Sequence, residues 1–139
     1  MFEALITEAG LDGDRQRDLR FHGGPDRAIV LFSLDVITAL QREGHPIAAG
    51  TTGENLTVSG LDWTAIVPGT ELRIGEVRLR IMKYTSPCEK IAPSFLEFDY
   101  TRISQKLHPG WSRLNARVLA GGLVSIGDAV EIAVLKSEP

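Results

Sequence analysis

Gly69-Thr-Glu-Leu-Arg-Ile-Gly-Glu-Val-Arg-Leu79 decides the fold, because apolar and charged residues alternate on both sides of its central Ile-Gly-Glu turn. A period of two is typical of strands with one buried face. Gly75 can adopt the positive φ that a tight hairpin turn requires. A second segment, Gly121-Gly-Leu-Val-Ser-Ile-Gly-Asp-Ala-Val-Glu-Ile132, carries the same turn at Gly127. Both segments are predicted to be β-hairpins in a mainly β chain.

Outward from these segments, short apolar runs separated by glycine and proline turns have the spacing of small barrels and sandwiches. Within the two segments the expected strands are 71–74, 77–83, 123–126 and 129–135. Further strands are predicted at 4–7, 27–32, 55–58, 65–67 and 116–120. The 139 residues, 43% of them hydrophobic, suit a single domain over 1–139 with its own core.

One helix is predicted over 33–44, with Ser33 as its N-cap and Gly44 as its C-terminal stop. Its apolar positions, expected in the core, are Leu34, Val36, Ile37 and Leu40. A second helical stretch is predicted within 95–107 from a weaker pattern.

The charge balance excludes several classes of protein. A net charge of −3 and a pI near 5.6 argue against a nucleic-acid-binding domain, which usually carries a basic surplus. The first ten residues include early acids and too short an apolar run for a signal peptide or a membrane span. The expectation is a soluble cytoplasmic protein without membrane contact, and a single cysteine is compatible with a reducing compartment.

The single cysteine, Cys88, lies in Lys83-Tyr-Thr-Ser-Pro-Cys-Glu-Lys90. Pro87 restricts the turn that presents the thiol, and a nearby lysine would favour the thiolate. A thiolate is a soft metal ligand or a sulfur nucleophile. The alternative is a buried cysteine that serves as a small apolar filler.

Three other patches are candidates to meet Cys88 in space. Arg20-Phe-His-Gly-Gly-Pro-Asp-Arg27 contains a tight bend at which the amides of Gly23 and Gly24, with Arg20 or Arg27, could hold a phosphate. An ordinary polar turn explains this stretch equally well.

The second patch, Thr51-Thr-Gly-Glu-Asn-Leu-Thr-Val58, offers the donors and acceptor of Asn55 to the edge of a heterocycle, or to the closing of its own turn. The third patch, His108-Pro-Gly-Trp-Ser-Arg113, offers Arg113 as an anion clamp, with Trp111 expected to pack rather than to stack on a ligand.

These patches together resemble the MOSC domain, named after the carboxy-terminal domain of molybdenum cofactor sulfurases. The resemblance runs in order from about Asp14 to Val130. Its motifs are His22-Gly-Gly-Pro-Asp-Arg27, Gly53-Glu-Asn-Leu56, Pro87-Cys88 and Ile126-Gly-Asp128. It implies a mainly β fold, a small closed or partly closed β-barrel with one or two short helices, that binds the molybdenum cofactor or carries sulfur. The chain is expected to be a minimal module of this kind.

The resemblance also implies roles for individual residues. Cys88 would be the catalytic residue, as molybdenum ligand or persulfide carrier. Asn55 would orient the pterin of molybdopterin, and the phosphate end would be lined by His22, Gly23, Gly24 and Arg27, with Arg113 as a further contact. Glu54 stands where larger relatives often have a basic residue. An acid there would repel an anionic cofactor unless its side chain turned away.

Several functions follow as alternatives. The first is a molybdenum enzyme that reduces N-hydroxylated small molecules and takes electrons from a partner protein. The second is a sulfur carrier that receives sulfane sulfur on Cys88 from a cysteine desulfurase, the partner alone holding pyridoxal phosphate. A cysteine hydrolase would need His22, His45 or His108 as base, and a non-catalytic ligand-binding module is a further alternative. The single cysteine and three scattered histidines lack the spacing of a structural zinc site.

Overall fold

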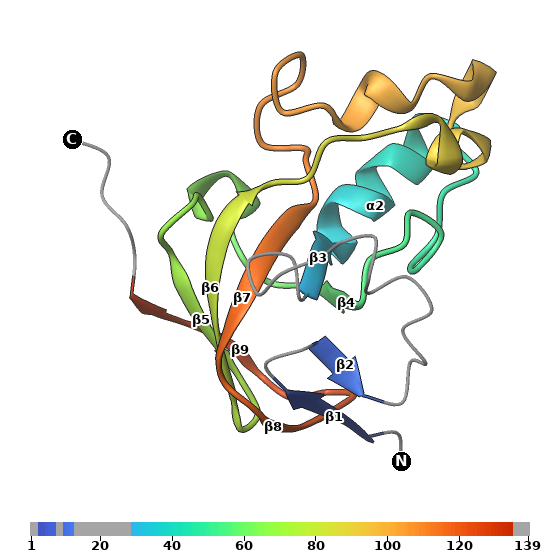
Figure 1. The fold of residues 1–139 in the computed structure, drawn as a ribbon. Helices are drawn as coiled ribbons and strands as arrows, with labels where there is room; N and C mark the ends of the chain where they lie inside the picture. The colour runs from blue at the N-terminus through green and yellow to red at the C-terminus, as the bar shows by residue number, and fades with distance from the viewer. Residues whose placement is uncertain (1–2, 8–9, 13–28, 135–139) are drawn as a thin grey trace. The chain divides into compact units, whose positions relative to one another are not determined.

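The computed structural model of the chain describes residues 3–7, 10–12 and 29–134, and it is mainly β, as predicted (Figure 1). The chain forms two compact units, each assembled from separate stretches of sequence. The strand unit comprises residues 1–29, 66–83 and 115–139, and the loop unit comprises 30–65 and 84–114. The expectation of one domain over 1–139 stays a prediction.

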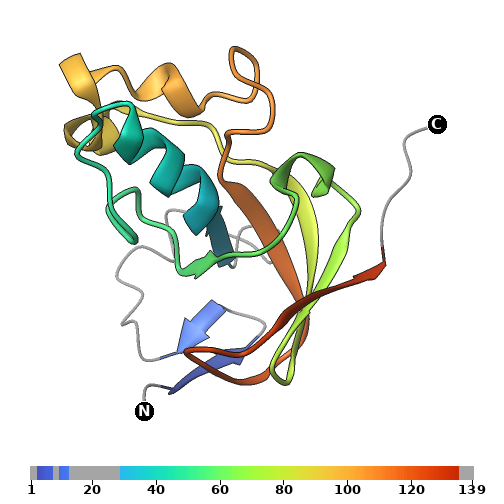
Figure 2. The ribbon, with the colours of Figure 1, turned by 180° about the vertical axis from the view of Figure 1, so that it is seen from behind.

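The strand unit contains two groups of hydrogen-bonded strands. In one group, β1 (Glu3–Thr7) pairs in antiparallel fashion with β2 (Gly10–Asp12) and with β8 (Gly122–Ser125). The strands of the other group follow the order β7-β6-β5-β9. Their bounds are β5 (Glu71–Ile74), β6 (Val77–Tyr84), β7 (Leu114–Ala120) and β9 (Val130–Val134). These four strands curl strongly in both views (Figures 1 and 2), which agrees with the predicted barrel-like fold.

The first predicted hairpin is confirmed. β5 and β6 pair in antiparallel register, with Ile74 opposite Val77 and a two-residue turn between them. Gly75 adopts a φ of 55°, and a Cβ at this position would lie 2.9 Å from the Leu123 carbonyl oxygen. Glycine is therefore required both for the turn and for the close approach of the next turn.

The second predicted hairpin is wrong, although its turn is present. The Asp128 amide donates to the Ser125 carbonyl across the Ile-Gly-Asp turn, and Gly127 adopts a φ of 96°. The strands on either side then separate, because β8 pairs with β1 and β9 pairs with β5. The same local turn therefore connects two sheets rather than two neighbouring strands.

In the loop unit, β3 (Ile29–Ser33) and β4 (Leu56–Val58) pair in parallel. Parallel neighbours need a long crossover, which here contains the helix α2 (Leu34–Arg42). All five residues of β3 are buried, which explains the uninterrupted apolar run of its first four residues.

The helix prediction is confirmed. The Ser33 hydroxyl accepts a hydrogen bond from the Val36 amide, and Gly44 follows the helix end with a φ of 102°. Ile37 and Leu40 are buried as predicted, whereas Leu34 is 42% exposed. Placing Leu34 in the core was wrong. It lies six residues before the buried Leu40, and residues six apart on a helix point about 120° away from each other.

The remaining elements are short 3₁₀ turns: η2 (Trp63–Ala65), η3 (Glu89–Ser94), η4 (Leu96–Phe98) and η5 (Tyr100–Ile103). The strand predicted at 65–67 is wrong, because Asp62 accepts hydrogen bonds from the Thr64 amide and hydroxyl and starts η2 instead. The helical stretch predicted within 95–107 is present only in part, as the 3₁₀ turns η4 and η5. Glu97 and Phe98 adopt positive φ values of 55° and 58°, which break that stretch into separate turns.

Candidate functional site

The Cys88 thiol lies exposed in the segment that follows β6. The residue has an extended backbone, with φ −143° and ψ 171°, and its carbonyl oxygen accepts the Ile91 amide at 3.1 Å, at the start of η3. The exposure contradicts the alternative that Cys88 is a buried apolar filler. The sulfur can be reached by a reagent, a metal centre or a partner.

The residues before Cys88 are held by Ser112 and Arg113, which directly precede β7. The Thr85 amide donates to the Arg113 carbonyl at 2.9 Å, and the Ser112 hydroxyl donates to the Thr85 carbonyl at 3.2 Å. The Arg113 side chain continues this pairing, because its Nη2 donates to the Ser86 carbonyl oxygen at 3.3 Å. The backbone two residues before the thiol is therefore fixed by Arg113.

The guanidinium of Arg113 also reaches the loop that carries the Gly53-Glu-Asn-Leu56 motif. Its Nη1 donates to the Thr52 carbonyl oxygen at 2.7 Å. The residue is only 6% exposed, and its Nε is buried with no hydrogen-bond partner among the described residues. Burial lowers the pKa of the guanidinium, while negative charge on Cys88 and on Glu54 acts in the opposite direction.

Glu54 turns its carboxylate into its own loop. The side chain is buried, with 8% exposure for the residue. One oxygen accepts the Gly50 amide at 2.6 Å and the Thr57 hydroxyl at 2.9 Å, and the other accepts the Thr52 hydroxyl at 2.7 Å. Three donors therefore explain why an acid stands at this position.

Asn55 joins the same loop to β3. Its Oδ1 accepts the Val30 amide at 2.7 Å, and its own amide donates to the Val30 carbonyl at 2.8 Å. The side-chain oxygen thus acts as a strand partner at the start of β4. The expectation that Asn55 orients a pterin stays a prediction.

The residues after Cys88 are tied to the same loop. The Ser94 hydroxyl, at the end of η3, donates to the Thr51 hydroxyl at 2.9 Å. The loop at 50–57 therefore supports the Cys88 segment on both sides, through Arg113 before the thiol and through Ser94 after it. The contributions of Thr51, Ser86 and Ser94 were not predicted from the sequence, although the hydroxyl-rich Thr51-Thr52 pair was part of a predicted patch.

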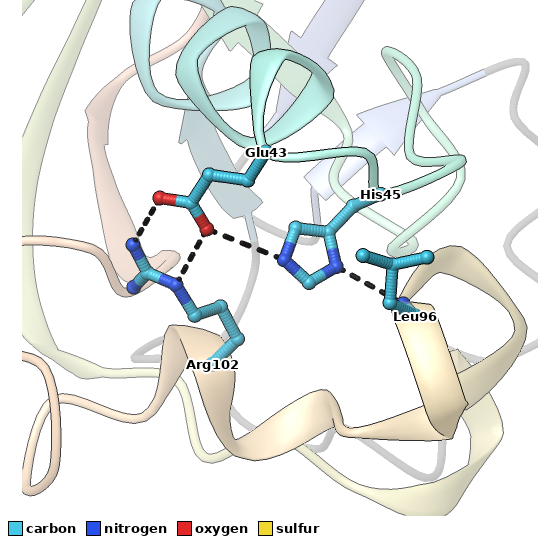
Figure 3. A network of polar contacts seen from close by, with 4 residues as sticks. All are labelled: Glu43, His45, Leu96 and Arg102. Atoms are coloured by element: carbon cyan, nitrogen blue, oxygen red, sulfur yellow. Dashed lines mark hydrogen bonds and ion pairs between the residues drawn. The ribbon is translucent and has the colours of Figure 1, made fainter.

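A separate polar network in the loop unit engages His45 (Figure 3). Its Nδ1 accepts the Leu96 amide at 3.0 Å, and its Nε2 lies 3.4 Å from a Glu43 carboxylate oxygen. Arg102 donates to both oxygens of Glu43, at 3.0 and 2.8 Å, and its guanidinium carbon lies 4.0 Å from the ring centroid of Trp111. Both ring nitrogens of His45 are occupied, so this histidine does not support a Cys88 hydrolase.

The other predicted anion-binding residues, His22, Gly23, Gly24 and Arg27, lie outside the described residues. Within the described ranges, no three His, Cys, Asp or Glu side chains are grouped so that they could hold a metal ion. A search of the same part of the chain finds no helix with the length and apolar character needed to cross a membrane.

Comparison with known proteins places this chain in a family. The model of the MOSC domain matches residues 18–131. The chain is 32% identical over 135 residues to protein YiiM of Escherichia coli K12, covering 94% of this chain and 59% of YiiM. It is 30% identical over 129 residues to the uncharacterized protein YflK of Bacillus subtilis 168, covering 92% of this chain and 58% of YflK.

A solved structure extends the likeness to the fold. The crystal structure of YiiM from Escherichia coli superimposes with a TM-score of 0.73 at 28% identity, covering 99% of this chain and 65% of that chain. The chain thus spans less than two thirds of the length of each of these relatives.

Proposed function

The chain belongs to the MOSC domain family, and on this premise we propose that it binds the molybdenum cofactor with the Cys88 sulfur as the ligand to the metal. The observation that carries the proposal is the exposed thiol on a segment held at both ends. A thiolate is a soft, polarizable metal ligand. The residues present therefore fit the cofactor at the metal end.

Charge supports the same assignment. The molybdenum cofactor is anionic, and the buried carboxylate of Glu54 is occupied by three donors of its own loop. The buried guanidinium of Arg113 adds positive charge close to the Cys88 segment. An acid in the Gly53-Glu-Asn-Leu56 motif is thus compatible with an anionic ligand.

The bound cofactor would supply the redox chemistry, and the protein would hold and orient it. In this proposal Cys88 holds the metal, Asn55 and Arg113 support the loops around it, and His22, Gly23, Gly24 and Arg27 receive the phosphate end. The reaction we propose is reduction of N-hydroxylated small molecules in the cytoplasm, with electrons from a partner protein.

The decisive test is anaerobic titration of the purified protein with mature cofactor, followed by measurement of retained molybdenum and pterin. We expect about one molybdenum per chain in the wild type and strongly reduced retention in Cys88→Ser. Glu89→Gln, which changes the adjoining exposed residue, is the matched control and should retain the metal. Equal retention by the wild type and Cys88→Ser would refute the ligand role of Cys88.

Sulfur carriage is a second candidate, favoured by the exposure of Cys88, which leaves the residue accessible to a partner protein. The Cys88 thiolate would attack the outer sulfur of a desulfurase persulfide, forming Cys88 persulfide and releasing the desulfurase thiolate. After incubation with a cysteine desulfurase and cysteine, intact-protein mass spectrometry should show one added sulfur atom, absent in Cys88→Ser. An unchanged mass with a desulfurase that loads another acceptor would refute this candidate.

A further inference from the structure

Arg113 connects the two motif-bearing loops of the loop unit. Its Nη1 binds the Thr52 carbonyl at 2.7 Å, and its Nη2 binds the Ser86 carbonyl at 3.3 Å. Its own carbonyl accepts the Thr85 amide at 2.9 Å. A single residue thus fixes the loop before Cys88 through its backbone and its side chain together.

The charge of Arg113 is not neutralised by direct contact with a carboxylate. In the described part of the chain, its side chain donates hydrogen bonds to carbonyl oxygens only, and no ion pair within 4.0 Å is found. The carboxylate of Glu54 acts on it electrostatically but is bonded to other donors. A buried cation with an unpartnered Nε exerts a strong field on its surroundings, because water screens it poorly.

Arg102, in the same unit, provides the contrast. Its guanidinium forms a two-point ion pair with Glu43 and lies on the ring of Trp111. The positive charge of Arg102 is therefore balanced by the adjacent carboxylate of Glu43. Arg113 is therefore the buried arginine of this unit whose charge is directed to the Cys88 segment.

We propose that Arg113 is the positioning residue of the Cys88 site: its guanidinium fixes the loop that presents the thiol, and its charge draws anionic groups to the sulfur. This inference rests on the proposed function of Cys88 and adds a preference for anionic ligands at that sulfur. Position and charge are separable, because lysine keeps the charge but cannot bridge the two carbonyl oxygens as the planar fork does.

The experiment measures both properties on the intact chain. The electrostatic effect of Arg113 at the Cys88 sulfur is measured with anionic and cationic methanethiosulfonates of similar size. The rates at which the two reagents modify Cys88, the only cysteine of the chain, are compared. In each reaction the thiolate attacks the reagent's sulfenyl sulfur, forms a mixed disulfide and expels methanesulfinate. The ratio of the two rates cancels thiolate fraction and general accessibility, so it reports the local electrostatic potential.

How firmly Arg113 holds the segment around Cys88 is measured by amide hydrogen exchange in peptides spanning 84–95. Wild-type protein should react faster with the anionic reagent. In Arg113→Met the anionic-to-cationic ratio should fall by about threefold to tenfold, the effect of one partly screened unit charge on reagents that differ by two charges. In Arg113→Lys the ratio should stay within about twofold of the wild type, while exchange in 84–95 becomes several-fold faster in both variants.

Two control variants give the sign and the location of the effect. Glu54→Gln should raise the ratio, because it removes the negative charge that opposes Arg113. Arg102→Met should leave the ratio unchanged, although it removes a partly buried arginine from the same unit. If the variants merely loosened the fold, the anionic-to-cationic rate ratio would change in the same direction in Glu54→Gln and in Arg113→Met. Changes in opposite directions would therefore show that the charge of the side chain causes the effect.

The proposal is overturned if Arg113→Met keeps the wild-type ratio, or if Arg102→Met lowers it equally. It is overturned as well if Arg113→Lys exchanges at the wild-type rate in 84–95. None of these measurements requires cofactor or sulfur donor. A protein that fails to retain molybdenum but shows the predicted ratios would refute the proposed function and leave the role of Arg113 intact.

Discussion

Two arginines of the loop unit show how differently one side chain can be used. Arg102 donates to both oxygens of Glu43 and lies 4.0 Å from the ring centroid of Trp111. Arg113 donates to two backbone carbonyls, at Thr52 and Ser86. Each has one buried nitrogen without a partner among the described residues, Nη1 in Arg102 and Nε in Arg113.

The difference lies in where the positive charge is balanced. The guanidinium of Arg102 forms an ion pair with a carboxylate, whereas the guanidinium of Arg113, among the described residues, donates hydrogen bonds only to backbone carbonyl groups. An ion pair adds local stability, and a guanidinium bound to carbonyls keeps a net charge inside the protein. The position of Arg113 beside the segment of the exposed thiol makes that charge useful to a site.

The largest effect on stability is expected from Arg113→Met. This change leaves the carbonyls of Thr52 and Ser86 without their donor and leaves the buried carboxylate of Glu54 without a nearby cation. We expect the free energy of unfolding to fall by about 3–5 kcal/mol, as when one member of a buried charged set is removed. Urea unfolding followed by circular dichroism measures it, and a loss below about 1 kcal/mol would show that Arg113 is dispensable to the fold.

A smaller effect is expected from Arg102→Met. Glu43 is half exposed and can be hydrated once its partner is lost, so the main losses are the ion pair and the contact with Trp111. These are worth about 1–2 kcal/mol together. If urea unfolding showed Arg102→Met to be less stable than Arg113→Met, the distinction between the two arginines would be wrong.

The stabilisation from the ion pair between Arg102 and Glu43 should also depend on pH. The hydrogen bond from Arg102 lowers the pKa of Glu43 below its ordinary value of 4.5. Because the folded pKa is lower, the stabilisation is present above the unfolded value and is lost as pH falls through the folded value. The difference in Tm between the wild type and Glu43→Gln should therefore narrow as pH falls from about 6 to about 3. A constant difference would contradict this.

The smallest effect is expected from Cys88→Ser. The residue is exposed, and the hydrogen bond that its carbonyl oxygen accepts from the Ile91 amide belongs to the backbone. We expect the free energy of unfolding to change by no more than about 0.5 kcal/mol. A larger loss in urea unfolding would mean that the thiol supports the fold, which would weaken its assignment as a site residue.

Local patterns in the sequence predicted the turns correctly, but they did not predict which strands pair with one another. Ile74-Gly-Glu and Ile126-Gly-Asp both form tight turns, yet only the first joins two paired strands. The partner of β8 is β1, more than a hundred residues earlier, and nothing local specifies such a contact. The same limit explains the strand wrongly predicted at 65–67, where an Asp62 cap starts a 3₁₀ turn instead.

The site shows a similar division. For the solitary cysteine behind Pro87, the sequence left a presented thiol and a buried filler as alternatives, and the structure exposes the residue. Arg113 was predicted as an anion clamp, and the structure shows its side chain buried and donating to Thr52, 61 residues earlier in the sequence. Glu54 was expected to threaten cofactor binding, and its three donors come from its own loop. Burial of charged side chains depends on tertiary contacts that a sequence pattern does not show.

The most direct test of the central claim is X-ray absorption at the molybdenum edge, on protein loaded anaerobically with mature cofactor. The proposal predicts one more sulfur neighbour of molybdenum in the wild type than in whatever metal Cys88→Ser retains, with Glu89→Gln matching the wild type. The same number of sulfur neighbours in the wild type and Cys88→Ser would show that the Cys88 sulfur does not bind the metal.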